Sequence, residues 1–329
     1  MISIIKYRFK KIVPNQIWTA ISGLVRHRND NFFSETRKEF GKKNKNTEIF
    51  VIRRKPPGGG LFSNVNYVLQ GLIYAEKKGM WPVVDMENYS TEYSRIRKFN
   101  GKKNAWEYFF YPVSNINLVD AYKSKNVTLS EGDRILKNHI MSGRNLAYVL
   151  DHEFLEESHK MYTKHIKLNS YTNSYIDYIL NTKEIVLDST LGVFLRGTDY
   201  LLGPTGHPIQ PGINDVIKDI TSFLGDKPIK KILLSTDDLQ LREKLEAKFG
   251  DLMIESIRSD SESLFSIQLR NQFEIPKGVI ARNLSYLSEI YILSKLSFNI
   301  SSLSNGSAIM YVINGGKFTD SKLYYYGVN

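Results

Sequence analysis

A regular alternation of short apolar runs with longer amphipathic stretches constrains the fold of this chain more than any other feature. In the second half, the apolar runs cover residues 190–196, 230–238, 251–257 and 298–304, with an edge element at 322–328. Amphipathic helical patterns cover residues 212–225, 238–250, 282–297 and 306–316. Strands that alternate with helices in this way form a parallel, doubly wound sheet.

The first half of the chain contains a shorter unit of the same kind. Residues 47–54 are typical of a strand, the glycines 58–60 of a tight turn, residues 63–78 of a helix and residues 81–86 of a second strand. A strand, a crossover helix and a second strand form a parallel unit. Residues 86–185 are rich in aromatic side chains and mostly helical or irregular in pattern. We therefore predict an α/β fold with two Rossmann-like, doubly wound domains.

The positive charge is concentrated at the N-terminus. The 329 residues carry a formal net charge of +11, and residues 1–60 hold 14 Lys and Arg against 4 Asp and Glu, a local net charge of +10. The basic character therefore belongs to an N-terminal extension. We predict a basic extension over residues 1–46, an α/β domain over residues 47–185 and a second α/β domain over residues 186–329.

The first thirteen residues have a basic amphipathic pattern. Apolar side chains share one helical face over residues 1–13, and basic side chains surround that face until Pro14 ends the pattern. Such a helix either binds an anionic membrane surface or packs against its own domain, and the sequence leaves both interpretations open. We expect no nucleic-acid partner, because no element that reads bases accompanies the charge.

The composition is compatible with a cytoplasmic location. Hydrophobic residues make up 42% and charged residues 24% of the chain, as in soluble globular proteins. No run approaches the ~18 apolar residues of a membrane span, and basic residues interrupt the apolar core that a secretory signal would need. The chain has no cysteine and therefore no disulfide. We expect a cytoplasmic location, peripheral at the inner membrane if residues 1–13 bind lipid.

Predicted strand-to-helix turns in the second half carry residues suited to binding an anion. Ligands of open parallel sheets bind outside the carboxyl ends of the strands. One strand ends at Arg196, whose guanidinium would either hold a phosphate through two hydrogen bonds or pair with Asp199. Another ends at Thr236, Asp237 and Asp238, where the acids either cap the next helix or contact the ribose or base of a nucleotide.

A third turn, Ser304-Asn305-Gly306-Ser307, lies between a strand and a short apolar helix. Its amides and hydroxyls would face an anion along the helix dipole. One serine is enough to cap a helix, so the turn holds more polar groups than a cap requires. Together the three turns favour a ligand that carries a diphosphate.

A glycine turn and an acidic pair in the first half each have two interpretations. Gly59 and Gly60 precede a helix with Asn64 in its first turns, but neither standard phosphate loop is present. Either the backbone approaches a ligand there, or the glycines form a plain tight turn. Asp85 and Glu87 are either a metal-binding pair or solvated acids at a strand end, and we favour the second interpretation.

These residues resemble a family of enzymes that transfer fucose from GDP-fucose, in particular the α-1,6-fucosyltransferases of N-glycan cores and rhizobial Nod factors. Arg196-Gly197-Thr198-Asp199 with His207-Pro208 is similar to a strand end of that family, and Thr236-Asp237-Asp238 is similar to its later Thr-Asp-Asp. Glu289 followed by residues 304–307 resembles an acidic helix residue that precedes a Ser-Ser turn. The order agrees over roughly residues 185–315 and more faintly over 48–112.

The resemblance implies a GT-B fold, in which two Rossmann-like domains face a cleft, with the acceptor on residues 47–185 and the nucleotide sugar on residues 186–329. By the same resemblance, Arg196 would hold the donor β-phosphate, Glu289 the guanosine and residues 304–307 the diphosphate. The enzymes of this family invert the configuration at the anomeric carbon of the sugar and need no metal ion or cofactor. The residues expected to bind the donor are Gly59, Gly60, Asn64, Arg196, Thr236, Asp237, Asp238, Glu289, Ser304, Asn305, Gly306 and Ser307.

The chain departs from the family at the position of Gly197, where a second arginine is common, and at residues 203–206, which lack the carboxylate thought to act as the base. A sugar hydroxyl needs such a base, and Asp199 is the first candidate and His207 the second. We expect an inverting, metal-independent transferase that moves a sugar, fucose by resemblance, from a GDP-sugar to an oligosaccharide or lipid-linked glycan of a bacterial surface polysaccharide or glycolipid. The alternative is a non-catalytic protein that binds a nucleotide sugar or glycan during assembly.

Overall fold

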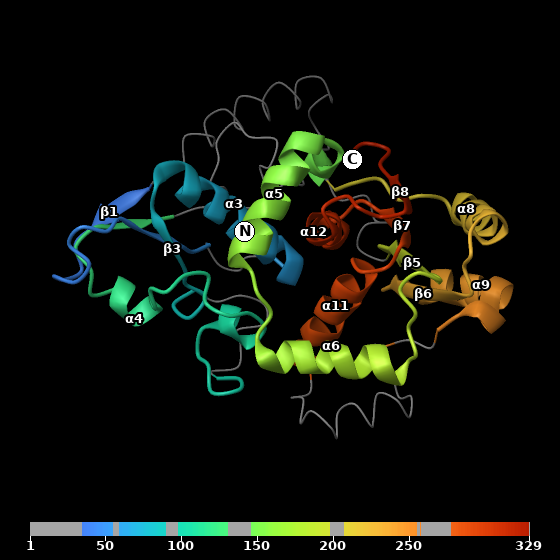
Figure 1. The fold of residues 1–329 in the computed structure, drawn as a ribbon, viewed down its shortest axis with the longest axis horizontal. Coiled ribbons are helices and arrows are strands. Elements are labelled where there is room, and N and C mark those ends of the chain that lie inside the picture. Colours follow the sequence, from blue (N-terminus) through green and yellow to red (C-terminus); the bar gives the residue numbers. More distant parts are fainter. Residues whose placement is uncertain are drawn as a thin grey trace, which may run out of the picture.

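The part of the chain that the structure describes forms two four-stranded sheets with a group of helices between them (Figure 1). The computed structural model describes residues 35–54, 59–89, 98–130, 146–197, 207–254, 257 and 278–328. The predicted α/β class with parallel strands is confirmed. Residues 1–34, including the amphipathic pattern at 1–13, lie outside the described residues. Within the described ranges, no helix is both long and apolar enough to cross a membrane.

The first sheet has the strand order β1-β4-β2-β3. Strand β2 pairs in parallel with β3 and with β4, whereas the edge strand β1 runs antiparallel to β4. The strands expected at 47–54 and 81–86 are confirmed, and β1 and β4 were not predicted, because three residues are too short to show a periodic pattern. The bounds are β1 Thr36–Lys38, β2 Ile49–Ile52, β3 Trp81–Val84 and β4 Val127–Leu129.

The second sheet has the strand order β6-β5-β7-β8, and all its neighbours pair in parallel. Every residue of β5 is buried, since helices cover both faces of the sheet. The strand expected at 251–257 is wrong for its described residues, because the chain continues from helix α9 into the 3₁₀ turn η3 and only Met253 bridges to Ile232. The bounds are β5 Thr190–Leu195, β6 Lys231–Thr236, β7 Phe298–Ser302 and β8 Asp320–Tyr324.

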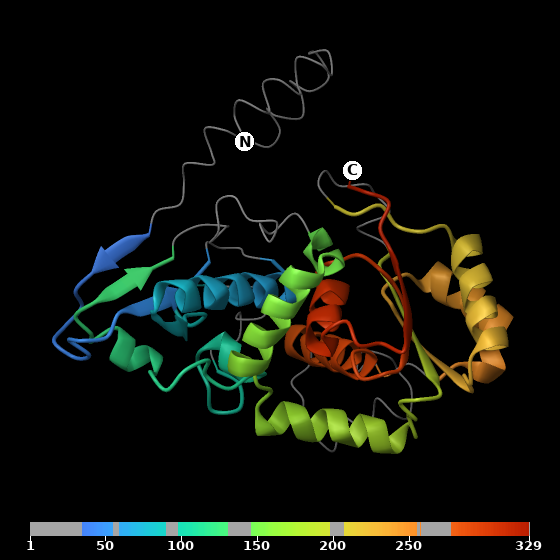
Figure 2. The same ribbon diagram turned by 45° about the horizontal axis from the view of Figure 1, so that its top comes forward.

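The helices form an outer pair and a central group. Helices α8 and α9 lie on the outer side of the second sheet, and the longest central helix, α3, runs from the middle of the molecule toward the first sheet (Figure 2). The bounds are α3 Leu61–Lys78, α4 Leu118–Ala121, α5 His152–His165, α6 Ser170–Thr182, α8 Ile213–Asp226, α9 Leu239–Phe249, α11 Val279–Leu293 and α12 Asn305–Asn314, with 3₁₀ turns η1 Ala105–Tyr108, η2 Leu146–Leu150 and η3 Gly250–Leu252.

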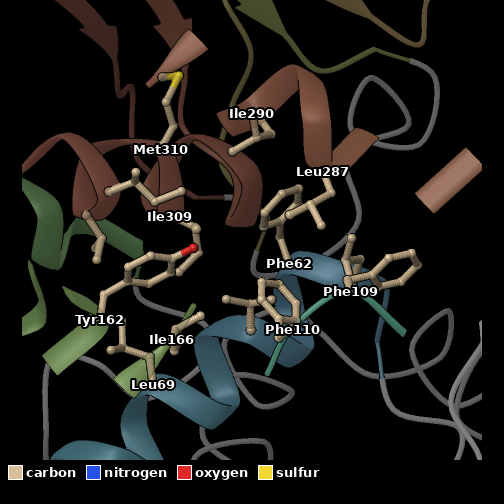
Figure 3. Packing of buried hydrophobic residues seen from close by; sticks show 14 of the residues in the cluster. Phe62, Leu69, Phe109, Phe110, Tyr162, Ile166, Leu287, Ile290, Ile309 and Met310 are labelled. Carbon is tan, nitrogen blue, oxygen red and sulfur yellow. The ribbon is translucent and has the colours of Figure 1, made fainter. Parts of the chain in front are cut away.

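The main apolar core lies between the central helices and contains residues from both halves of the chain. Helix α12 packs against α3 and α5, and α11 packs against α6 and α12. Phe62 of α3 lies beside Leu287 of α11, and Ile309 of α12 faces Tyr162 of α5 (Figure 3). Because interiors are packed as densely as organic crystals, this core holds the amino ends of α3 and α12 in a fixed relation. The division at residue 186 stays a prediction.

Candidate functional site

The three polar turns of the second half meet at one edge of the second sheet. Strands β6, β5 and β7 are adjacent and parallel, so their carboxyl ends lie together. Leu195 pairs with Thr236, and Phe194 pairs with Ser301, which aligns the strand ends within a residue or two. The three turns therefore lie at one edge of the second sheet.

Arg196 is held at this edge by a carboxylate of the neighbouring strand end. Its Nη1 lies 2.9 Å from Oδ2 of Asp237, and the other oxygen of Asp237 accepts the Gly197 N–H at 2.8 Å. The Arg196 N–H donates to Ser302 Oγ at 3.1 Å. Both charged side chains are about one-fifth exposed, 21% and 22%. The guanidinium is thus oriented by Asp237, and the expected alternative partner, Asp199, lies outside the described residues.

Asp238 and Thr236 have local structural contacts. Asp238 Oδ1 accepts the Leu241 N–H at 3.1 Å as the N-cap of α9, and Thr236 Oγ1 accepts the Asp238 N–H at 3.2 Å. A Cβ atom on Gly197 would lie 2.2 Å from the Asp238 Cβ atom. Any side chain at residue 197 would therefore collide with Asp238, so the approach of the two strand ends requires glycine there.

The serines at the start of α12 form a capping box. Ser304 Oγ accepts the Ser307 N–H, Ser307 Oγ accepts the Ser304 N–H at 2.8 Å, and the Ser307 hydroxyl also donates to the Ser302 carbonyl at 2.8 Å. These hydroxyls are therefore used inside the turn. Among the described residues, no acceptor bonds the backbone amides of Asn305 and Gly306. The amides, rather than the hydroxyls, are the donors that this helix end offers to an anion.

Asn305 is oriented by a hydrogen-bonded chain from the first half. The Tyr148 hydroxyl donates to Asn66 Oδ1 at 2.8 Å, and Asn66 Nδ2 donates to Asn305 Oδ1 at 2.9 Å. Burial raises the pKa of Tyr148, so the hydroxyl stays protonated and donates. Because its oxygen faces Asn66, Asn305 presents its amide NH₂ on the opposite side. Helix α3 thus fixes a donor at the amino end of α12.

Glu289 lies beneath the edge of the second sheet rather than on its surface. The side chain projects from α11, and the residue is 1% exposed. Its Oε2 accepts the Ser235 hydroxyl of β6 at 2.6 Å. Ser235 lies two positions before Asp237 in the chain, so Glu289 is close to the strand end, and its predicted contact with guanosine stays a prediction.

The glycine turn of the first half is braced by an arginine that the sequence did not single out. Asn64 Nδ2 donates to the Gly59 carbonyl at 2.6 Å and to the Gly60 carbonyl at 3.3 Å. Arg54 Nη1 donates to Ser63 Oγ at 2.9 Å and to Asn64 Oδ1 at 3.3 Å. A Cβ atom on Gly59 would lie 2.6 Å from Ser63 Oγ, so the turn is tight. The missed signal was an arginine at the carboxyl end of an apolar strand, as at Arg196.

The remaining candidates have separate positions. Pro208 bridges to Val328, and the Ile209 N–H donates to the Gly327 carbonyl, so the C-terminal residues place the segment that begins at His207. The favoured interpretation of solvated acids is wrong for Asp85, which is buried, whereas Glu87 is exposed. Asp85 accepts the Tyr122 hydroxyl at 2.6 Å and the Asn88 N–H at 3.0 Å. Burial, followed by this bond to Asp85, raises the pKa of Tyr122. The described residues contain no cluster of three side chains able to hold a metal ion.

Comparisons with known proteins return fucosyltransferases. No family model and no curated protein matches the chain. A NodZ α-1,6-fucosyltransferase soaked with GDP-fucose matches with a TM-score of 0.47 and 17% identity, over 81% of this chain and 93% of that chain. Fucosyltransferase NodZ from Bradyrhizobium matches with a TM-score of 0.45 and 17% identity, over 81% and 92%. A mutant of Arabidopsis thaliana FUT1 in complex with GDP matches with a TM-score of 0.45 and 11% identity, over 86% and 71%.

Proposed function

We propose that this protein is an inverting, metal-independent glycosyltransferase that transfers fucose from GDP-fucose to a glycan. One observation carries the proposal: an oriented arginine and the amino end of α12 converge at the carboxyl edge of one parallel sheet. In folds of this class, that edge is where ligands bind. The motifs that resemble α-1,6-fucosyltransferases fall on the same turns, which supports a GDP-sugar as the ligand.

The geometry suits the departure of a nucleoside diphosphate. When the acceptor hydroxyl attacks the anomeric carbon, the bond to the β-phosphate oxygen breaks and negative charge grows on that phosphate. Asp237 orients the Arg196 guanidinium, whose planar fork of N–H donors has the geometry that suits phosphate oxygens. Arg196 and the amides of α12 would then stabilise the transition state more than the ground state, as donors placed in advance do.

The acceptor proton needs a base, for which Asp199 and His207 are the candidates that we propose. Both follow Arg196 in sequence, and a carboxylate or an imidazole can take a proton from a hydroxyl as the new bond forms. The acceptor that we propose is an oligosaccharide or lipid-linked glycan of a bacterial surface polysaccharide or glycolipid. The basic residues 1–13 support a position at an anionic membrane surface.

The decisive test is the variant Arg196→Ala, assayed with labelled GDP-fucose for transfer or hydrolysis. Loss of one such charge-stabilising contact lowers the rate by roughly 10²–10³-fold, and we expect that loss with an unchanged far-UV circular dichroism spectrum. Arg37→Ala is the matched control, because Arg37 is an exposed arginine on edge strand β1 whose pairing with Glu48 is far from the proposed chemistry. Turnover of Arg196→Ala near that of the unchanged protein would refute the proposal.

A further inference from the structure

Arg54 has no opposite charge beside its guanidinium among the described residues. It follows strand β2 and is half-buried, and its Nη1 donates to the neutral groups Ser63 Oγ and Asn64 Oδ1. Its Cζ atom lies 5.4 Å from the centroid of the Tyr67 ring. Its Nε atom is buried and has no hydrogen-bond acceptor among the described residues. In the part of the chain that the structure describes, no carboxylate forms an ion pair with it.

An arginine in this setting lacks a compensating negative charge and some of its hydrogen-bond acceptors. Burying a charge without an opposite charge is costly, and buried guanidinium N–H groups normally have acceptors. Arg196, at the corresponding end of the second sheet, meets that requirement through Asp237. Arg54 meets it only in part, through two neutral oxygens, so its remaining donors and its full charge are available to an anion.

The surroundings of Arg54 add further positive potential. Gly60 gives the amino end of α3 no side-chain cap, and the first turn of α3 contains no acidic residue. Ser63 and Asn64, which hold the guanidinium, both belong to that first turn. The amides at the start of a helix carry partial positive charge. The arginine and the helix end therefore act on the same space.

This position lies beside the amino end of α12. Phe62, in the first turn of α3, packs edge-on against Tyr286 with ring centroids 4.8 Å apart. The Tyr286 hydroxyl approaches Gly306 so closely that a Cβ atom there would lie only 2.3 Å from it. One tyrosine thus separates the first turns of α3 and α12. Asn66 of α3 also donates to Asn305 of α12 at 2.9 Å, so the two helix ends are held close together.

We infer that Arg54, Ser63 and the amino end of α3 form a binding site for an oxyanion, either a phosphate or a carboxylate. The chemistry comes from a planar fork of N–H donors with backbone amides beside it, which suits two oxygens of one group. Two sources can supply that group: the diphosphate of the proposed donor, or an acidic group on the proposed acceptor. The choice of sources rests on the proposed function, whereas the site itself does not.

The test is isothermal titration calorimetry on the full chain, with pyrophosphate, GDP, guanosine and methyl glucuronide as separate probes. We expect Arg54→Gln to bind pyrophosphate at least tenfold more weakly than the unchanged protein, since hydrogen bonds to charged groups are the strong ones. Arg54→Lys keeps the charge but loses the fork, so its loss should be smaller. Arg37→Gln removes one exposed positive charge elsewhere and should bind as the unchanged protein does.

The outcomes separate this site from the proposed function. A loss of GDP affinity in Arg54→Gln without a loss for guanosine assigns the site to the donor, and a loss confined to methyl glucuronide assigns it to the acceptor. Unchanged affinity of Arg54→Gln for both anions, or no binding of either anion by the unchanged protein, overturns the site even if Arg196→Ala abolishes transfer. Weakened pyrophosphate binding together with no transfer from any GDP-sugar keeps the site and rejects the function.

A second variant is needed if Arg54→Gln fails to fold. Ser63→Ala removes only a neutral hydrogen-bond partner of Arg54 and should still weaken pyrophosphate binding several-fold.

Discussion

The ends of strands β5 and β2 carry the same residue type in opposite electrostatic settings. Each strand is an inner strand of its sheet, with parallel neighbours on both sides. Arg196 follows β5 directly, and Arg54 follows β2 after one intervening residue, Arg53. At β5, Arg196 is paired with Asp237, which also bonds the next backbone amide. At β2, Arg54 is braced by Ser63 and Asn64, which have no charge.

The two settings show that orienting a guanidinium and keeping its electrostatic field are separate effects. A carboxylate fixes a guanidinium firmly but cancels part of its field, whereas neutral acceptors fix it less firmly and leave the field intact. A transition state needs donors that are already in place, and a ground-state anion needs net attraction. We therefore expect Arg196 to act mainly on turnover and Arg54 mainly on binding.

Removing Asp237, the carboxylate at the end of β6 that pairs with Arg196, is the change with the largest expected effect. Asp237→Ala should lower kcat by roughly 10²-fold, because a reacting group misplaced by about an ångström costs that much. The affinity for GDP should stay the same or increase, since the variant removes one negative charge beside Arg196. Separate measurements of kcat, KM and the GDP dissociation constant show the division.

Two controls make the Asp237 result specific. Asp237→Asn keeps an oxygen that can accept the Gly197 N–H, so its kcat should lie between those of the unchanged protein and Asp237→Ala. If Asp237→Ala instead weakens GDP binding tenfold, Asp237 contacts the nucleotide directly and the comparison with β2 fails. An unchanged kcat would mean that the pair does not orient Arg196.

Gly197 tests how closely the ends of β5 and β6 must approach. In Gly197→Ala the new Cβ atom would lie 2.2 Å from the Asp238 Cβ atom, which sits close to the backbone and cannot swing away. We expect a loss of about 1–3 kcal/mol in the free energy of unfolding, as in other overpacked sites. Urea unfolding measures this loss.

Gly225 provides the matched control for Gly197. It lies in helix α8, and no atom of the described residues lies within 4 Å of the place that a Cβ atom would take, so Gly225→Ala should stabilise the protein by about 0.5–1 kcal/mol. Equal effects of the two alanines would show that backbone freedom, and not the approach of the strand ends, decides the outcome at residue 197.

The placement of Arg196 at the sheet edge could be predicted from the sequence, but its partner could not. Alternating strands and helices imply parallel strands, and parallel strands bring their carboxyl ends together. The contact with Asp237 depends on register, because Leu195 pairs with Thr236 and so sets Asp237 beside Arg196. The register between two strands depends on how they pair, so the sequence of one strand alone does not determine it.

Contacts between the two halves were also beyond sequence reasoning. Asn66 and Asn305 bond across 239 residues, and no local pattern marks either as a partner of the other. Glu289 is similar: its helix was predicted, but its burial against Ser235 depends on how α11 packs beneath β6. Tertiary packing decides such positions, whereas periodicity decides only which face of an element is buried.

An exposed ion pair between α3 and α5 shows how little a charge pair away from the strand ends should add to the free energy of unfolding. Lys164 Nζ of α5 lies 2.8 Å from both carboxylate oxygens of Glu76 near the end of α3, and the two side chains are 50% and 45% exposed. The hydrogen bond from Lys164 lowers the pKa of Glu76. A lowered pKa in the folded state adds stability at pH values above the ordinary glutamate pKa, about 4.3, and this stability is lost as the pH falls through the folded pKa.

Glu76→Gln should therefore lower the free energy of unfolding by only about 0.2–0.5 kcal/mol at pH 7, since solvent screens the pair. At pH 2 it should have no effect, because Glu76 is protonated in both states. Urea unfolding at the two pH values measures this, and a cost above about 1 kcal/mol would mean that an exposed pair matters as much as the half-buried pair of Arg196 and Asp237.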